Sequence, residues 1–167
     1  MPAPKFLRLI SGKVKEIYAA VVATADSIVA TDATGRIDVS FLPVGVGAEV
    51  FTAVASEALL AGDFVNVYSN AGVLNARKAD ATTNTKPANG FVLANVASAG
   101  VATVYIIGQL NSAIAGLTVG SEYFLSTTPG TITVTSPSAT GNISQFIGRA
   151  DKVTEIPFSN VTYIEIA

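Results

Sequence analysis

The chain of 167 residues contains neither cysteine nor histidine. It therefore has no thiol nucleophile, no disulfide, no structural zinc site of the usual kinds and no histidine acid or base. Its apolar runs also stop short of the roughly 20 residues that a membrane-spanning helix needs. We expect no enzyme activity, no catalytic residue, no cofactor or metal site, and no membrane partner.

Charge is scarce as well. Charged residues make up 13% of the chain, whereas hydrophobic residues make up 50%. A chain of this length can bury a true core, and a surface so poor in charge is expected to be covered in part by other subunits. The formal net charge of −2 argues against a general nucleic-acid binder.

The basic residues that are present gather at the N-terminus. Four of the ten precede the first acid, Glu16. Residues 1–15 are expected to form an extended arm, and three roles stay open for it: a solvated tail, docking on an acidic protein surface, or contact with nucleic acid. Large apolar side chains in the arm need a partner, so the candidate contact residues are Lys5, Phe6, Arg8, Leu9, Lys13 and Lys15.

The chain is expected to divide into an N-terminal docking region, 1–47, and a β-rich body, 48–167. Pro43 and the nearby glycines end the first region. Within that region, the β-branched content of residues 14–25 leaves helix and strand open. The region's aspartates recur every six residues, which does not match a calcium loop, so we interpret them as turn formers.

The body has the pattern of an all-β protein. The clearest element is a hairpin in residues 117–134, with Pro129-Gly130 at its turn. Two polar segments, 78–90 and 136–144, are predicted to be surface loops. β-branched and aromatic runs predict further strands at 50–54, 64–68, 73–74, 91–96, 101–107, 146–147 and 161–166.

A shift of 58 residues lays one part of the body over another. The shift matches turn glycines and apolar strand positions in order, among them Leu59 with Leu117, Gly62 with Gly120, Gly72 with Gly130, Gly90 with Gly148, and Tyr105 with Tyr163. Residues 59–107 and 117–165 are therefore candidate copies of one multi-strand unit. Either a duplication or recurrent hairpin patterns would produce the match. An antiparallel β-barrel or sandwich would hide most strand edges.

Two segments carry a resemblance to a known group of proteins. The stretch VATDATGRIDVSFLPVGVG, residues 29–47, resembles the N-terminal part of many tailed-bacteriophage virion proteins. AGLTVGSEYFLSTTPGTIT, residues 115–133, followed by GNISQFIGRA, is similar to a hairpin of phage capsid-decoration and head-fibre-like proteins. The two segments cover about a third of the chain.

The resemblance implies a structural protein of the virion. Decoration (cement) proteins of this kind are β-rich, commonly form homotrimers, and brace the major capsid protein, with no catalytic residues. We therefore expect a capsid-surface protein, made in the host cytoplasm, that binds and stabilises the outer shell. The alternative is a tail or head fibre that contacts the host through the loops 78–90 and 136–144.

Overall fold

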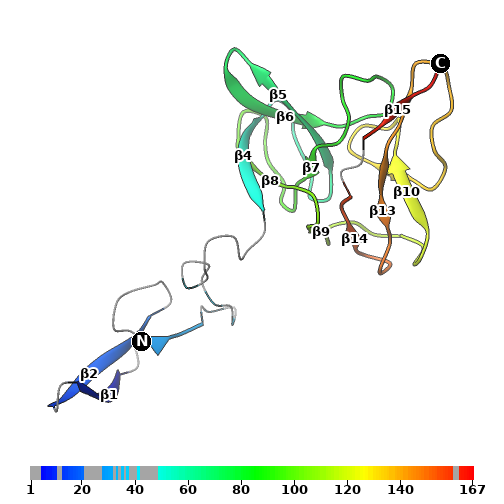
Figure 1. Ribbon diagram of the computed structural model, residues 1–167. Helices are drawn as coiled ribbons and strands as arrows, with labels where there is room; N and C mark the ends of the chain where they lie inside the picture. Colours follow the sequence, from blue (N-terminus) through cyan, green and yellow to red (C-terminus); the bar gives the residue numbers. More distant parts are fainter. Residues whose placement is uncertain are drawn as a thin grey trace. The chain divides into compact units, whose positions relative to one another are not determined.

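The computed structural model describes residues 5–10, 13–20, 28–31, 33, 35, 37, 41, 49–159 and 162–167. The chain separates into two compact units, Met1–Gly47 and Ala48–Ala167. We call the first the N-terminal unit and the second the body, and describe each by itself (Figure 1).

The described part of the N-terminal unit is a small three-stranded sheet. Antiparallel strands β1 (Lys5–Ile10) and β2 (Lys13–Ala20) form a hairpin, and β3 (Ile28–Val29) joins β2 in parallel. The predicted extended arm is thus a paired ribbon. For residues 14–20 strand prevails over helix, as β-branched residues favour, while residues 21–25 lie outside the described part.

The body is all-β in its described residues, as predicted. Its first half holds β4 (Val50–Ala55), β5 (Phe64–Asn70), β6 (Val73–Lys78), β7 (Gly90–Phe91) and β8 (Val101–Tyr105). These strands close into a barrel in the order β4-β6-β5-β7-β8, shown from cyan to green in Figure 1. Five strands cannot alternate in direction all the way round a ring, so one pair, β4 with β6, is parallel.

The second half of the body consists of short strands, and we define it as residues 110–159. Its described strands are β9 (Leu110–Asn111), β10 (Glu122–Leu125), β11 (Ile132–Thr133), β12 (Ile143–Ser144), β13 (Phe146–Arg149) and β14 (Ile156–Pro157). The pairing of β10 with β11 confirms the predicted hairpin around Pro129-Gly130. Strand β15 (Ile164–Glu165) closes the chain beside β12, so the predicted strand 161–166 is shorter, and Val161 lies outside the described part.

The core of the body consists of two clusters, because successive side chains of β5, and of β7 with the residue after it, point to opposite faces. Val65 and Val92 point into the barrel, which is lined by small side chains such as Ala53, Ala76 and Ala102 because five strands leave a narrow bore. Their neighbours Phe64 and Phe91 point the other way, into a second cluster shared with the second half of the body.

That second cluster joins the two halves through aromatic rings. The ring centroids of Phe64, Phe91 and Phe158 lie 5.8 to 6.2 Å apart, and Tyr105 stacks on Phe91 at 5.5 Å. Contacts of this geometry add to the free energy of apolar burial. The second cluster is therefore a core that both halves share, whereas the barrel cluster belongs to the first half.

The loop 78–90 corrects a prediction. Its composition predicts a surface position, but Ala79, Asp80, Ala81 and Ala88 are buried. The Ala81 N–H donates to the Ser126 carbonyl, and the Ala81 carbonyl accepts from the Ile143 N–H. Because its buried side chains are mostly small, this polar segment runs between the halves, and its buried backbone N–H and C=O groups form hydrogen bonds with backbone groups of the second half. The predicted strand 91–96 is likewise reduced to Gly90–Phe91, since Val92 onward bonds to a turn.

Two strand pairs of the body match at a shift of 58 residues. Phe64 pairs with Phe91 and Val65 with Gly90, and 58 residues later Glu122 pairs with Arg149 and Tyr123 with Gly148. A turn bond repeats as well: Gly62 N–H donates to the Val92 carbonyl and Gly120 N–H to the Ala150 carbonyl, both at 2.8 Å. These matches support, as a proposal, two copies of one unit.

The proposed match fails beyond β13. A Cβ added to Gly90 would collide with the carbonyl of Tyr105, and one added to Gly148 with that of Pro157. Strand β14, which contains Pro157, therefore occupies the place of β8. Tyr163, which the shift of 58 pairs with Tyr105, lies elsewhere, beside β15 and within hydrogen-bond distance of Asn84. The connection before β14 is shorter than the one before β8, and a fixed shift cannot follow it.

Candidate docking surfaces

The basic residues of the N-terminal unit lie on its hairpin. The register places Arg8 opposite Lys15 and Ile10 opposite Lys13, so three cationic positions adjoin one another across β1 and β2. Like charges directly opposite destabilise a strand pair in isolation. Contact with an acidic surface would offset the repulsion between these cationic positions.

Only part of the predicted contact set can be placed in detail. The side chain of Lys13 is exposed, as is that of Leu7, which is not in the predicted set and is 74% accessible. For the other predicted residues the structure gives strand positions: Lys5, Phe6, Arg8 and Leu9 on β1, and Lys15 on β2. Their side chains lie outside the described part.

The body carries an apolar surface that the sequence does not reveal. On β4, β6 and β8, the exposed large apolar residues are Val50, Val73, Leu74 and Val101, the last 69% accessible. We call these four the barrel patch. Thr52, Ala53 and Val54 complete a shallow groove of about 210 Å³ beside three of them. β4 has apolar residues of both parities in VFTAVA, which signals a strand with two apolar faces.

The barrel patch includes the tip of the β5–β6 hairpin, whose turn is tight. Ala71 and Gly72 have φ of 49° and 85°, the left-handed pair of a two-residue type I′ turn. Below the tip, the Arg77 guanidinium stacks over the Tyr68 ring at 4.5 Å and donates to Asn66 Oδ1 at 3.0 Å. The hairpin is thus a braced projection with apolar side chains at its end.

A second hollow lies between the halves of the body. It holds about 400 Å³ and is lined largely by small residues and backbone of 61–63, 113–117 and 130–132. Its acidic group is Asp63, which accepts a hydrogen bond from the Leu60 N–H at 2.8 Å and pairs with Lys78 at 3.2 Å. The carboxylate is therefore already engaged in holding the turn before β5.

The pKa of Asp80, which lies in the loop 78–90, is lowered in the folded chain. Burial by itself would raise the pKa of Asp80. Hydrogen bonds from Thr82 and from Lys86, together with the Lys86 charge, outweigh it and hold the pKa below its ordinary value. The Lys86 Nζ lies 3.0 Å from Asp80 Oδ2. This carboxylate stabilises the loop and faces no cavity.

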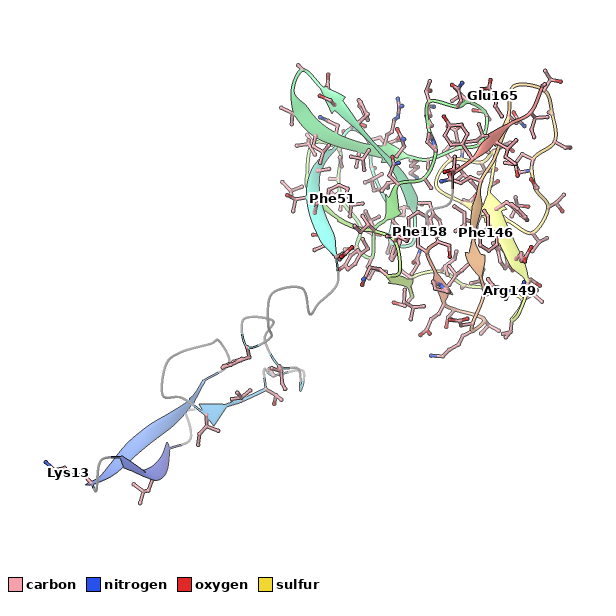
Figure 2. All side chains as sticks on the ribbon, viewed as in Figure 1. Lys13, Phe51, Phe146, Arg149, Phe158 and Glu165 are labelled. Atoms are coloured by element: carbon pink, nitrogen blue, oxygen red, sulfur yellow. The ribbon has the colours of Figure 1, made fainter. Side chains whose placement is uncertain are left out.

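Because the chain has no cysteine or histidine, only its acids are considered as metal ligands. Over the described ranges, no group of three or more acids is placed to hold a metal ion. In the same ranges, no helix is long and apolar enough to cross a membrane. The candidate surfaces are the exposed apolar residues of the body and, separately, the basic positions on the strands of the N-terminal unit. Figure 2 draws the described side chains of both units, with Lys13 labelled on the hairpin.

Comparisons with known proteins give one structural likeness to report. No family model and no curated protein matches the chain. The crystal structure of the head fibre gp8.5 N base of bacteriophage phi29 is similar, with a TM-score of 0.46 and 17% sequence identity, over 71% of this chain and 92% of that chain. A likeness at this TM-score carries no argument about function.

Proposed function

We propose that the protein is a structural component of a phage virion that binds the outer surface of the capsid and stabilises it. The major capsid protein is the proposed partner, and a homo-oligomer, with a trimer favoured, is the proposed working form. The N-terminal unit, 1–47, is the proposed docking region. The observation that carries the proposal is the split into a cationic hairpin and a separate, apolar-surfaced body.

Each part suits one task. The hairpin presents Arg8, Lys13 and Lys15 at neighbouring register positions, a charge pattern that an acidic shell surface complements. The body adds a rigid, hydrogen-bonded mass with exposed apolar residues, which are typical of a surface that another subunit covers. Several arms on one oligomer would raise the occupancy of the shell through effective concentration.

The docking role is tested by a matched pair of charge reversals. Lys13→Glu changes an exposed lysine of the hairpin, and Lys152→Glu changes a lysine of the body that is also largely exposed. We expect the first to weaken binding to purified capsids about tenfold at low salt, with the difference shrinking as salt rises, and the second to leave binding unchanged. Co-sedimentation with capsids measures both.

Removal of residues 1–15 should have the larger effect. Capsid occupancy equal to that of the full chain, with the body still folded by circular dichroism, would overturn the docking role of the hairpin. Stabilisation is measured by heating the same capsids with and without the protein, because a bracing protein raises the temperature at which capsids release their contents.

A second candidate function is a tail or head fibre that contacts the host. The observation that favours it is the exposed stretch 138–141 of the segment 136–144, which turns at Gly141 with φ of 84°, although Ile143 of this segment is buried in β12. In the other predicted contact loop, 78–90, residues 79–81 and 88 are buried, which leaves only its middle part, with Thr82, Asn84 and Thr85 exposed, for a receptor. Immunogold labelling of particles separates a tail fibre from a decoration protein, since label confined to the tail would exclude the decoration role.

A further inference from the structure

One dipeptide of the body is chemically labile. Asn89-Gly90 is the one Asn-Gly pair in the sequence. In such a pair the glycine N–H attacks the side-chain amide carbon of the asparagine, because glycine has no Cβ to crowd the five-membered ring that forms. A bond forms between Gly90 N and Asn89 Cγ, the bond from Cγ to Nδ2 breaks, and Nδ2 leaves as ammonia with the proton of the Gly90 N–H. Water then opens the succinimide to an aspartate or an isoaspartate.

The fold binds residue 89 to β5 through both its side chain and its backbone. Asn89 Oδ1 accepts a hydrogen bond from the Val67 N–H at 2.8 Å and another from Asn66 Nδ2 at 3.0 Å. The Asn89 backbone N–H donates to the Val65 carbonyl at 2.8 Å. Turning the amide carbon toward Gly90 N therefore costs hydrogen bonds that the folded chain has already made.

The attacking group is held as well. Gly90 is the first residue of β7, pairs with Val65 of β5 and is buried. On its other side, the Tyr105 carbonyl of β8 lies where a Gly90 Cβ would be. The planar ring of a succinimide turns the backbone of residue 89 out of the extended conformation that pairing with a strand requires. The barrel therefore has to open around β7 before the ring closes.

The side chain that holds the Asn89 amide is itself anchored. Asn66 is buried in β5, its Nδ2 also donates to the Pro87 carbonyl at 2.9 Å, and its Oδ1 accepts from Arg77 Nε at 3.0 Å. These bonds connect β6 through β5 to the segment that precedes β7. The protection of Asn89 therefore depends on a closed barrel and not on one contact.

We propose that Asn89-Gly90 is a latent deamidation site, which is unreactive in the folded body and reacts once the barrel opens. The isoaspartate product then prevents the barrel from closing again. A long-lived unfolding of the body is thereby made irreversible, and opened chains are removed from those able to bind a partner. This chemistry belongs to the body alone and does not depend on the proposed function.

The two products of the reaction differ in their fit to the barrel. An aspartate at position 89 still has an oxygen that accepts from the Val67 N–H and Asn66 Nδ2. The main chain of an isoaspartate runs through the former side chain and is longer by one methylene group. That group would lie between two anchors on the same residue of β5, since Val65 accepts from the Asn89 N–H and pairs with Gly90. Backbone on both sides of Gly90 leaves no space for the added length.

Peptide mass spectrometry of position 89 tests the protection. The full chain is kept at mildly alkaline pH, either folded in buffer or unfolded in urea, and the deamidated fraction is followed over time. We expect deamidation to be at least about tenfold slower in the folded chain, because the reaction then waits for the barrel to open. Equal rates in buffer and in urea would overturn the proposal.

Ala71→Gly supplies a matched control within one molecule. It creates a second Asn-Gly pair at the exposed tip of the β5–β6 hairpin, where Ala71 already has a φ of 49° that glycine adopts readily. We expect urea to speed deamidation at Asn70 far less than at Asn89, because Asn70 is exposed in the folded chain. Equal protection of the two sites would show that the contacts of Asn89 are not its cause.

Refolding of the aged chain tests the effect of the product. After ageing in urea, the mixture is diluted into buffer, the folded species is separated by size exclusion, and isoaspartate is measured by enzymatic methylation. We expect the folded species to contain asparagine or aspartate at position 89, and isoaspartate to remain in the chains that do not refold. Isoaspartate in the folded species at its share of the whole mixture would overturn the proposed block.

Freshly prepared Asn89→Asp separates added charge from added length. We expect this variant to fold with an unfolding midpoint close to that of the unsubstituted chain, because its carboxylate accepts the same hydrogen bonds. Failure of the variant to fold would overturn the assignment of the block to the lengthened main chain.

Discussion

The two halves of the body contain one strand pair of equivalent register and differ in the side chains that this pair carries. In the first half, β5 and β7 meet at Phe64 and Phe91, which sink into the shared core; in the second, β10 and β13 meet at Glu122 and Arg149, which stay in solvent. One pairing geometry thus serves as core or as surface according to the side chains placed on it. The comparison teaches that the backbone sets where a contact can form, and the residues decide whether the chain itself makes it.

The strongest way to break the shared core is to remove a ring that both halves use. Phe158 is buried and packs on Phe64 and Phe91. We expect Phe158→Ala to lower the free energy of unfolding by about 3–5 kcal/mol, since it loses apolar burial and leaves a cavity. Chemical denaturation measures it. Phe146→Ala, at a half-buried ring that meets Phe124 edge-on, should cost less. An equal cost would show that the aromatic cluster between the halves contributes no more to stability than a peripheral ring pair.

The equivalence of the halves is sharpened by a pair of glycines. A Cβ at Gly90 or at Gly148 would collide with the backbone of the neighbouring strand. We expect Gly90→Ala and Gly148→Ala each to cost about 3 kcal/mol through overpacking. Gly108→Ala is the control, because its φ of 80° carries strain of about 1–2 kcal/mol but nothing lies near its Cβ. Tolerance of alanine at one of the two sites would show that the halves are built differently there.

A single side chain tests the link between loop 78–90 and the second half. Gln145 is buried, accepts from the Ala88 N–H at 2.7 Å and donates to the Ala88 carbonyl at 2.9 Å. Gln145→Leu leaves both backbone groups buried without this partner, which we expect to cost about 2 kcal/mol. Gln109→Leu, at a half-buried glutamine, should change the unfolding midpoint little. Comparable losses of unfolding free energy for the two variants would show that the Gln145–Ala88 hydrogen bonds do not stabilise the link between the loop and the second half.

The smallest expected effect depends on pH. The pKa of Asp80 is lower in the folded chain than its ordinary value of 3.8, so its stabilisation is present above that value and is lost as pH falls through the folded pKa. We expect Asp80→Asn to cost about 1 kcal/mol at neutral pH and progressively less below about pH 4. Unfolding midpoints across that range measure it, with the exposed Asp151→Asn as control. A cost that stays constant with pH would mean that Asp80 acts by packing alone.

Local patterns were sufficient to predict much of the fold. β-branched runs and turn glycines predicted the all-β body and the hairpin at Pro129-Gly130, because strand alternation and positive φ are properties of short segments, and they left barrel and sandwich open. The burial of loop 78–90 was missed, since its polar composition is typical of a surface and its partners Ser126 and Ile143 are distant in sequence.

The candidate surfaces were harder to predict. The cluster of basic residues near the N-terminus is visible in the sequence, and its docking role stays a proposal. The barrel patch was missed because Val73 and Val101 become neighbours only when β6 and β8 flank β4 in the closed barrel. Sequence periodicity shows that a strand has two apolar faces, but it does not show which face finds a partner.

The loop that runs between the halves also bears on how the body comes apart. Ala81 is bonded on one side to Ser126 and on the other to Ile143, so neither half can leave without exposing the backbone of 79–81 to be satisfied by water. The halves should consequently unfold in one cooperative step, with a slow unfolding rate and amides in this loop among the last to exchange with solvent. Residues 79–81, whose polar surroundings in the sequence resemble a protease site, should therefore resist cleavage for as long as the body is folded.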